Sequence, residues 1–152
     1  MKKRDILILL AVIIIDQVTK IMVFNLNKDN IEIVKGFFSL TKVKNSGAAW
    51  GLFSGYMWLF FIVSIIALYF MLKLYKKSLN KDYYFSFALI LMIGGTLGNL
   101  IDRLLFGYVR DFLNFIIFTY DYPVFNVADM ALVIGVGLVI LFLIKNPEEE
   151  LI

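Results

Sequence analysis

The sequence predicts an all-α integral membrane protein with four transmembrane helices and a small β-hairpin. Of its 152 residues, 61% are hydrophobic and 16% are aromatic, whereas a soluble domain is closer to half apolar. The mean hydropathy is +0.85. A helix crosses a hydrocarbon core of about 30 Å with roughly 20 residues. Four apolar stretches are long enough to do so: 6–24, 56–75, 83–105 and 127–144.

The first apolar stretch resembles a secretory signal, because Lys2, Lys3 and Arg4 precede it. However, the run continues past Asp16 without a small-residue cleavage pattern, and three further spans follow. We therefore expect a retained helix. With no repeat or long linker, the chain is expected to form one membrane-embedded domain over residues 1–152.

Lysine and arginine favour one side of the membrane slightly. In short loops these residues mark the cytoplasmic side. Eight flank the termini and the second loop, and six lie in the first and third loops. The eight are Lys2, Lys3, Arg4, Lys73, Lys76, Lys77, Lys81 and Lys145; the six are Lys28, Lys35, Lys42, Lys44, Arg103 and Arg110. We therefore expect both termini in the cytoplasm.

The two loops on the opposite side carry structure of their own. In residues 37–44, FFSLTKVK, apolar and polar side chains partly alternate, and some residues are β-branched. This pattern predicts a short strand or hairpin within loop 26–50. Loop 106–126 is rich in Phe and Tyr. Such a segment is typical of the membrane–water interface, where aromatic belts lie.

The chain contains no cysteine and no histidine. Thiol nucleophiles, imidazole bases, disulfides and the usual zinc ligands are therefore excluded. Any chemistry must use carboxylates, hydroxyls, amides, Lys and Arg, and we expect no metal and no organic cofactor. The net charge is +3, and the basic residues lie in segments that flank the membrane. Anionic lipid headgroups can bind them there, so no nucleic-acid partner is expected.

The first helix carries ionisable residues in its DQVTK segment, 16–20. Asp16 and Lys20 are four residues apart and share a helical face, so they can pair. Pairing is the usual way to hold charges at membrane depth. We interpret them as a structural ion pair, which is favoured over a catalytic role. Gln17 and Thr19 can add hydrogen bonds between helices.

The KNSGAAWG segment, 44–51, returns the first loop to the membrane. Asn45 offers a donor and an acceptor, and Gly47 permits close approach of the backbone. Three interpretations stay open. A glycine-rich turn before the second helix is favoured, a substrate-contacting loop is next, and a Ser–Lys pair of Lys44 and Ser46 is least favoured.

The third helix ends in GGTLGNLIDR, 94–103. Gly94 and Gly98 form a GxxxG motif, which allows two membrane helices to pack closely. Asn99 and Asp102 lie on one helical face. Arg103 follows Asp102 directly, so the residues alone favour a local Asp–Arg network that anchors the helix end.

The fourth helix begins at FNVAD, 125–129. Asn126 is a good N-cap, and Asp129 then occupies the third helical position, where an acid completes a capping box. Helix capping is thus one explanation for this acid.

Three carboxylates are predicted at the same end of the protein, which is more than capping requires. They are Asp102, Asp111 and Asp129, with Asn45, Asn99 and Asn126 nearby. If two carboxyls approach within about 3 Å, repulsion prevents both from ionising at neutral pH. One can then act as a base and the other as an acid, as in aspartic proteases.

Five segments together are characteristic of a known family. DQVTK, NSGAAWG, GGTLGNLIDR, GYVRDF and FNVAD resemble, in order and spacing, those of the type II, or prolipoprotein, signal peptidases. Each motif alone is weak, but the five together are specific and extend from the first helix to the fourth.

The resemblance implies a four-helix aspartyl peptidase of the bacterial inner membrane, with a small extracytoplasmic β-cradle and its active site near the outer face. Its substrates would be prolipoproteins, cut on the amino side of a diacylglyceryl-modified cysteine. Membrane lipids are further partners, and a monomer is expected. The resemblance places the catalytic pair on Asp111 and Asp129. Residues that would line or brace the site are Asn45, Gly47, Asn99, Asp102, Arg103 and Asn126, with Asp16 and Lys20 as structural support.

Two positions depart from the family pattern. Arg110 stands where the family usually has an aliphatic residue, and it could either favour the ionised form of Asp111 or point to headgroups. Asn114 stands where an acid is common, which bears on the surface contacts of this loop.

Two other functions are compatible with the composition. A small proton- or ion-coupled transporter also uses intramembrane carboxylates, but it needs them distributed through the membrane. A structural subunit of a larger complex predicts no close acid pair. The distribution and separation of the acids therefore discriminate among the three.

Overall fold

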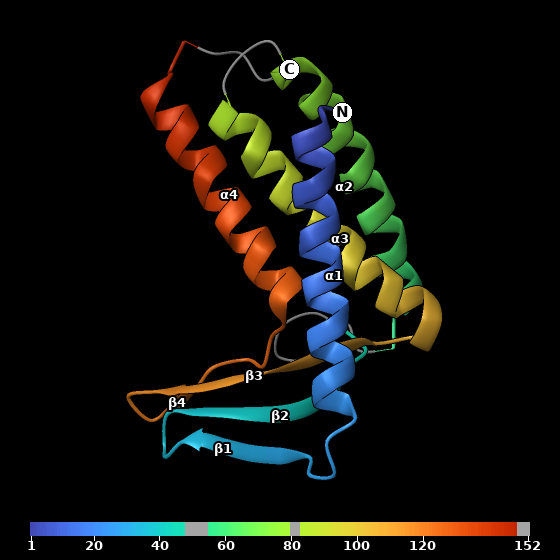
Figure 1. Ribbon diagram of the computed structural model, residues 1–152, viewed down its shortest axis with the longest axis vertical. Coiled ribbons are helices and arrows are strands. Elements are labelled where there is room, and N and C mark those ends of the chain that lie inside the picture. Colours follow the sequence, from blue (N-terminus) through green and yellow to red (C-terminus); the bar gives the residue numbers. More distant parts are fainter. Residues whose placement is uncertain (48–54, 80–82, 149–152) are drawn as a thin grey trace.

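The computed structural model describes residues 1–47, 55–79 and 83–148. Four helices run side by side, and a small sheet lies across one end of the bundle (Figure 1). The helices are α1 (Lys3–Phe24), α2 (Met57–Ser78), α3 (Tyr83–Phe106) and α4 (Val127–Lys145). The start of α1 and the end of α4 both lie at the end opposite the sheet (Figure 1).

The four predicted helices are confirmed, and each is long and apolar enough to cross a membrane. Their bounds lie within three residues of those predicted from hydropathy. The main differences are extensions: α1 begins at Lys3 and α2 continues to Ser78. A helix does not end where its apolar run ends, because charged side chains can reach the headgroups while the backbone stays helical.

Helix α3 forms the centre of the bundle. In its most apolar window 67% of residues are buried, against 11–22% for the other three helices. Its glycines let the neighbours approach. A Cβ on Gly98 would lie 2.6 Å from Asp16 Oδ2 on α1, and one on Gly95 would lie 2.3 Å from the Ala128 carbonyl oxygen on α4. The close packing predicted from GxxxG is therefore found at the α1–α3 contact.

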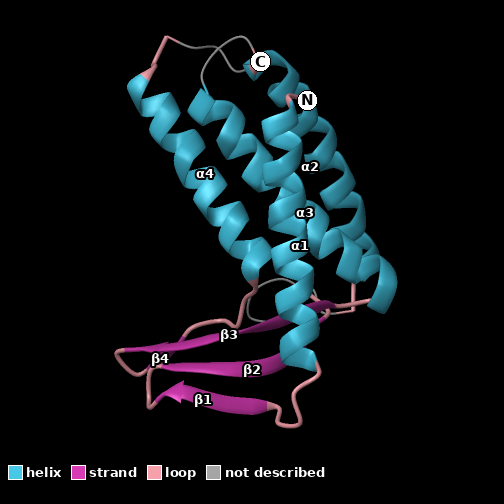
Figure 2. Cartoon of the chain, in the orientation of Figure 1, coloured by secondary structure: helices cyan, strands magenta, loops and turns pink. Residues whose placement is uncertain are grey.

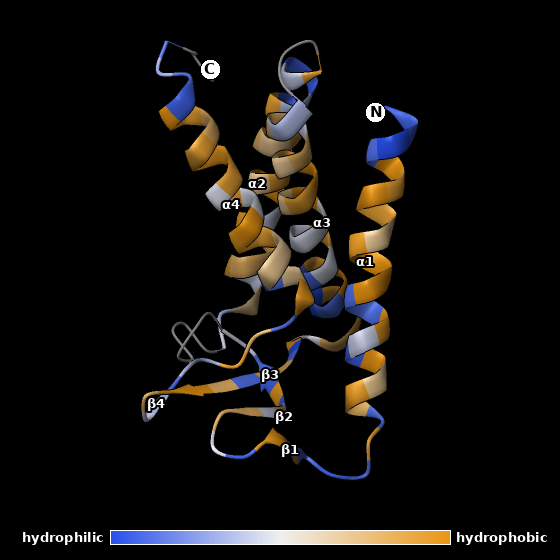
Figure 3. Cartoon of the chain, turned by 60° about the vertical axis from the view of Figure 1, so that its left-hand side comes forward, coloured by the Kyte–Doolittle hydropathy of each residue, from blue (hydrophilic) through white to orange (hydrophobic). Residues whose placement is uncertain are grey.

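Apolar side chains of the other three helices are exposed at the surface of the bundle, and Figure 3 colours much of α1 and α4 as hydrophobic. Leu7, Trp58 and Val133 are each more than 60% exposed. Such surfaces suit hydrocarbon rather than water.

The sheet is antiparallel, with strand order β1-β2-β3-β4 (Figure 2). The strands are β1 (Asn30–Val34), β2 (Phe38–Asn45), β3 (Val109–Ile117) and β4 (Tyr120–Asp121). The hairpin predicted in the first loop is β1–β2. The expectation of an all-α class is wrong in one respect, because loop 106–126 supplies β3 and β4. The first four residues of β3 are all buried, so apolar and polar residues do not alternate along this strand. The sequence therefore lacks the pattern that would predict it.

Candidate active site

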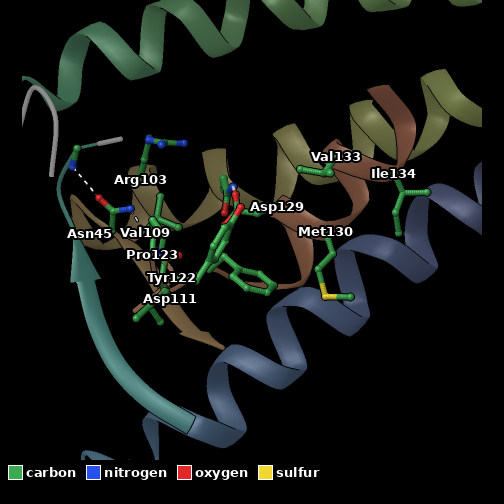
Figure 4. A pocket seen from close by; sticks show the side chains of 14 residues that line it. Asn45, Arg103, Val109, Asp111, Tyr122, Pro123, Asp129, Met130, Val133 and Ile134 are labelled. Atoms are coloured by element: carbon green, nitrogen blue, oxygen red, sulfur yellow. Dashed lines mark hydrogen bonds between the residues drawn. The ribbon is translucent and has the colours of Figure 1, made fainter. Parts of the chain in front are cut away.

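The predicted site residues meet where the helix bundle joins the sheet. A cavity of about 520 Å³ opens there, between β3, the end of α3 and the start of α4 (Figure 4). Polar groups line one part of it and the apolar side chains of α4 line another. The predicted residues on its wall are Asn45, Gly47, Asn99, Arg103, Asp111 and Asp129.

Asp111 lies on β3 and lines the cavity, although only 1% of its surface is exposed. Asn45 Nδ2 donates to Asp111 Oδ2 at 2.8 Å, and Asn126 Nδ2 donates to Oδ1 at 2.6 Å. Burial, together with the negative charge of Asp129, raises the pKa of the Asp111 carboxyl to about 7. This carboxyl can therefore hold a proton at neutral pH.

Asp129 completes the capping box predicted at the start of α4. Its backbone N–H donates to Asn126 Oδ1 at 3.0 Å, and its Oδ2 accepts from the Asn126 N–H at 3.1 Å. Its second oxygen does more than cap, because Oδ1 accepts from Asn99 Nδ2 at 2.7 Å. Asp129 and Asp111 line the same cavity, and Asn126 bonds to both.

The amide groups around these acids have defined orientations, because each oxygen faces a donor that cannot accept. Asn45 Oδ1 accepts from the Gly47 N–H at 2.9 Å. Asn126 Oδ1 accepts from the Asp129 N–H, and Asn99 Oδ1 accepts from Lys20 Nζ at 3.0 Å. The NH₂ side of each amide must therefore face a carboxylate.

The ion pair predicted in DQVTK is present and fully buried. Lys20 Nζ lies 2.8 Å from Asp16 Oδ2, and neither side chain is exposed. Both residues also bond to other helices, which a simple i, i+4 ion pair does not require. Lys20 bonds to Asn99 on α3, and Asp16 Oδ1 accepts from the Ala128 N–H at the start of α4 at 3.0 Å. DQVTK is thus tied directly to the residues around the cavity.

The local Asp102–Arg103 network expected from the sequence is replaced by another pair. Arg110 Nη2 and Nε donate to the two oxygens of Asp102 at 2.8 and 3.2 Å. Arg103 instead borders the cavity, with its guanidinium 5.5 Å from the centre of the Phe60 ring. Adjacent helical residues point about 100° apart, so two neighbours can face different surroundings.

Arg110 takes neither of the orientations expected for it. It is 6% exposed, so it does not reach the headgroups. It does not pair with Asp111 either, because successive strand residues point to opposite faces. The departure from the family pattern thus places a buried cation behind the acid pair rather than beside it.

The remaining candidates contribute less. Lys44 is exposed, with its ammonium 5.3 Å from the centre of the Tyr108 ring, which does not fit a buried catalytic lysine. Residues 48–51 of its motif lie outside the described residues. Asn114 Oδ1 is buried without a hydrogen-bond partner among the described residues. Among all the residues that the structure describes, no group of three or more acids is placed to hold a metal ion.

Sequence reasoning missed some residues of the site. Tyr122, Pro123 and Met130 line the cavity, but nothing separates such residues from ordinary lipid-facing ones in a sequence this apolar. Gln17 was expected to bond between helices, and it does so as a donor to Asp102 and an acceptor from Arg110.

The arrangement of acids discriminates among the functions considered. In the described helices the only acids are Asp5, Asp16, Asp102 and Asp129. Asp5 lies at the far end of the bundle and the other three lie toward the sheet, so the middle of the bundle lacks the series that a proton relay needs. A purely structural subunit would not need two acids in one cavity, yet Asp111 and Asp129 line the same cavity and both bond to Asn126. The arrangement therefore favours an enzyme over both alternatives.

Comparison with known proteins places this geometry in a family. A profile of the family described as signal peptidase (SPase) II matches residues 8–145. Two curated relatives from Staphylococcus aureus, strains JH9 and Newman, are both named lipoprotein signal peptidase. Each is 43% identical over 148 residues, covering 96% of this chain and 91% of the relative.

Solved structures agree with the sequence comparison. One, titled as a bacterial membrane enzyme structure by the in meso method at 1.9 Å resolution, superposes with a TM-score of 0.87 at 42% identity and covers 96% of both chains. A second, of the same description at 2.3 Å, has a TM-score of 0.85 at 40% identity and covers 99% of this chain and 95% of the other. By profile, relatives and fold together, this chain belongs to the signal peptidase II family.

Proposed function

We propose that this protein removes signal peptides from bacterial prolipoproteins, using Asp111 and Asp129 as its catalytic pair. The bond cut is the one on the amino side of a diacylglyceryl-modified cysteine. The observation that carries the proposal is the contrast between these two acids and the other buried ones. Both border the cavity, and among the described residues both accept hydrogen bonds only from amides, whereas Asp16 and Asp102 are paired with cations.

The pair holds one proton near neutral pH, which suits it to peptide hydrolysis. A water molecule between the two carboxyls attacks the carbonyl carbon of the scissile amide, and the ionised carboxylate takes the proton that this water loses. The protonated carboxyl supplies a proton to the substrate, and the C–N bond breaks as the leaving nitrogen is protonated. The products are a new carboxyl group and a free amine.

Among the amides, Asn45 is the best donor to the developing oxyanion. Both N–H groups of Asn126 Nδ2 are used, by Asp111 Oδ1 and Asn99 Oδ1. Asn45 Nδ2 donates one N–H to Asp111, and its second N–H has no further hydrogen bond to the part of the chain that the structure describes. One such donor contributes roughly 3 kcal/mol in other hydrolases. Arg103 on the cavity wall can bind a substrate carbonyl in addition.

The acyl chains of the substrate lie against the apolar part of the cavity. Met130, Val133 and Ile134 follow one another along α4 from the acid pair towards the middle of the bundle (Figure 4). Each is more than 40% exposed. A lipid tethered there brings the adjoining peptide to the carboxyls at the end of the helix.

The sheet end faces the outside and both termini lie in the cytoplasm. Of the six basic residues at the sheet end, Arg103 lines the cavity and Arg110 forms a buried ion pair with Asp102, so neither faces the headgroups. Lys42 is paired with Asp29. At the end with the termini, Arg4 is paired with Asp5. Pairing and burial thus take more basic residues from the sheet end than from the termini, which favours this orientation.

The outer surface of the sheet contacts lipid headgroups. The turn between β3 and β4 presents Phe118, which is 97% exposed, and Tyr120 and Tyr122 follow with about half of their surfaces exposed. Aromatic side chains at a membrane surface prefer this interface. The enzyme acts as a monomer, since the helices and the sheet of one chain together bring all the proposed site residues to one cavity.

The test is cleavage of a synthetic diacylglyceryl prolipoprotein by the purified protein in micelles, with products identified by mass spectrometry. Asp111→Asn and Asp129→Asn are expected to reduce kcat/KM by about 10³-fold. Asp5→Asn is the matched control, because Asp5 is also 1% exposed but lies at the far end of the bundle, and it is expected to retain activity. Full cleavage by both Asn variants in folded protein would overturn the assignment.

A further inference from the structure

Arg110 lies close to the cavity and is held by several groups, yet it does not line the cavity. Its guanidinium donates twice to Asp102, once to Gln17 Oε1 at 2.9 Å, and lies 4.5 Å from the centre of the Phe106 ring. Its backbone N–H also donates to Asp102 Oδ2, at 2.8 Å. A side chain and a backbone group at one position thus hold the same carboxylate.

The charges behind the acid pair balance only with Arg110 included. Asp16 and Asp102 are fully buried, as is Lys20. Lys20 Nζ lies 2.8 Å from Asp16, 3.0 Å from Asn99 Oδ1 and 3.5 Å from Asp102. The contact with Asp102 is the longest of the three. Because Arg110 satisfies both oxygens of Asp102, the ammonium of Lys20 can bond to Asn99.

We propose that Arg110 is a positioning residue for the acid pair: by neutralising Asp102 it keeps Lys20 on Asn99, whose amide in turn holds Asp129. The contact chain runs from Arg110 to Asp102 and Lys20, and then through Asn99 to Asp129 Oδ1 at 2.7 Å. The backbone bond of Arg110 to Asp102 also anchors β3 one residue before Asp111.

Without the charge of Arg110, Lys20 is left to neutralise two buried carboxylates. No other charged group in the described residues is placed to replace it. Arg103 borders the cavity, and Lys44, the cross-strand neighbour of Arg110, is exposed and lies over Tyr108. Lys20 then moves from Asn99 towards Asp102. The acid pair loses a donor and gains nearby negative charge, and both changes favour its protonated form.

The experiment compares Arg110→Gln, which keeps a donor but loses the charge, with Arg110→Lys, which keeps the charge. Because the role of Arg110 presumes the dyad chemistry proposed above, wild type and Asp111→Asn are assayed in parallel on the diacylglyceryl prolipoprotein. Arg110→Gln is expected to lower kcat about tenfold, leave KM within about twofold, and shift the acidic limb of the pH–rate profile up by roughly half to one unit. Arg110→Lys is expected to keep the wild-type profile.

A double variant shows whether charge balance is the cause. Asp102→Asn with Arg110→Gln removes one charge of each sign, so its pH profile is expected to return towards wild type. Arg4→Leu is the matched control, since it breaks an Arg–Asp pair at the far end of the bundle, and it is expected to leave the pH profile unmoved.

The outcomes separate the two proposals. An Arg110→Gln enzyme with wild-type kcat and pH profile, or an equal shift in Arg110→Lys, would overturn the role of Arg110 while leaving the dyad intact. Failure of the wild type to cleave, or full activity of Asp111→Asn, would overturn the dyad itself. If Arg110→Gln does not fold, a shifted profile in the charge-balanced double variant contradicts the proposal.

Discussion

The two ends of the helix bundle both bury aspartates, but they treat them differently. At the far end Asp5 accepts from Arg4 Nη2 at 3.0 Å and from Tyr75 Oη at 2.5 Å. Nearby, Ser78 Oγ donates to Ser86 Oγ at 3.1 Å and links α2 to α3. At the sheet end, Asp111 and Asp129 border a cavity, and within residues 1–47, 55–79 and 83–148 they accept hydrogen bonds from amides alone.

The hydrogen-bond partners of a buried acid decide whether that acid can exchange a proton. A carboxylate paired with a cation is held ionised, and its bonds tie helices together. A carboxylate that only amides hold, and that lies beside a second acid, can exchange a proton near neutral pH. Burial alone therefore does not identify an active site. The partners of the buried acid do.

The largest effect that would sharpen this comparison is expected from an amide at the sheet end. Asn126→Ala removes the donor to Asp111 and the cap of α4 together, so kcat/KM is expected to fall by about 100-fold or more. Steady-state cleavage assays measure it.

Asn146→Ala is the matched control for this change. Asn146 lies at the other end of α4, where its Nδ2 donates to the Phe142 carbonyl at 2.9 Å. We expect its activity within about twofold of wild type, because this amide bonds to a backbone carbonyl at the end of α4 far from Asp111 and Asp129. Similar losses in both variants would mean that α4 stability, and not the amide, sets the rate.

The next effect concerns pH and stability. The pKa of Asp111 is raised to about 7 in the folded protein, so between pH 4 and 7 the folded state keeps a proton that the unfolded state releases. Stability from this group is present at low pH and is lost as the pH rises to 7. Asparagine does not titrate. The unfolding free energy of wild type minus Asp111→Asn is therefore expected to fall by roughly 2 kcal/mol from pH 5 to pH 7.

Thermal unfolding of both proteins in micelles at several pH values measures this difference. Parallel curves, with a constant gap between wild type and variant, would show that Asp111 is ionised throughout and would contradict its proposed role.

The smallest effect is expected at the far end. Tyr75→Phe removes the hydrogen bond to Asp5, so the unfolding free energy is expected to fall by about 1–2 kcal/mol. Cleavage activity is expected to change less than twofold, because Asp5 and its partners Arg4 and Tyr75 lie at the opposite end of the bundle from the cavity. A tenfold loss of activity in protein that stays folded would break the distinction between the two ends.

Features that depend on local sequence could be predicted. The four helices follow from apolar length, and the capping box follows from the three-residue spacing of Asn126 and Asp129. The Asp16–Lys20 pair follows from its i, i+4 spacing. In each case the partners lie within one turn of helix, so tertiary packing does not change the contact.

Features that depend on which face meets which neighbour could not be predicted. Arg110 bonds to Asp102 because β3 turns it away from Asp111, whereas the sequence of this segment favours an interfacial loop over a strand. The bond of Lys20 to Asn99 requires the close approach of α1 and α3 that Gly98 permits. Asp5 follows three basic residues and resembles a headgroup-facing charge, so its burial against Tyr75 leaves no local signal.

Infrared difference spectroscopy can detect directly whether Asp111 and Asp129 share one proton. The carbonyl stretch of a protonated carboxyl is followed from pH 5 to pH 8 in wild type, Asp129→Asn and Asp5→Asn. We expect a protonated carboxyl in wild type and Asp5→Asn that titrates near pH 7. In Asp129→Asn it should titrate at lower pH, because the charge that helps to raise the Asp111 pKa is gone. An identical titration in all three proteins, or no protonated carboxyl at pH 6, would contradict it.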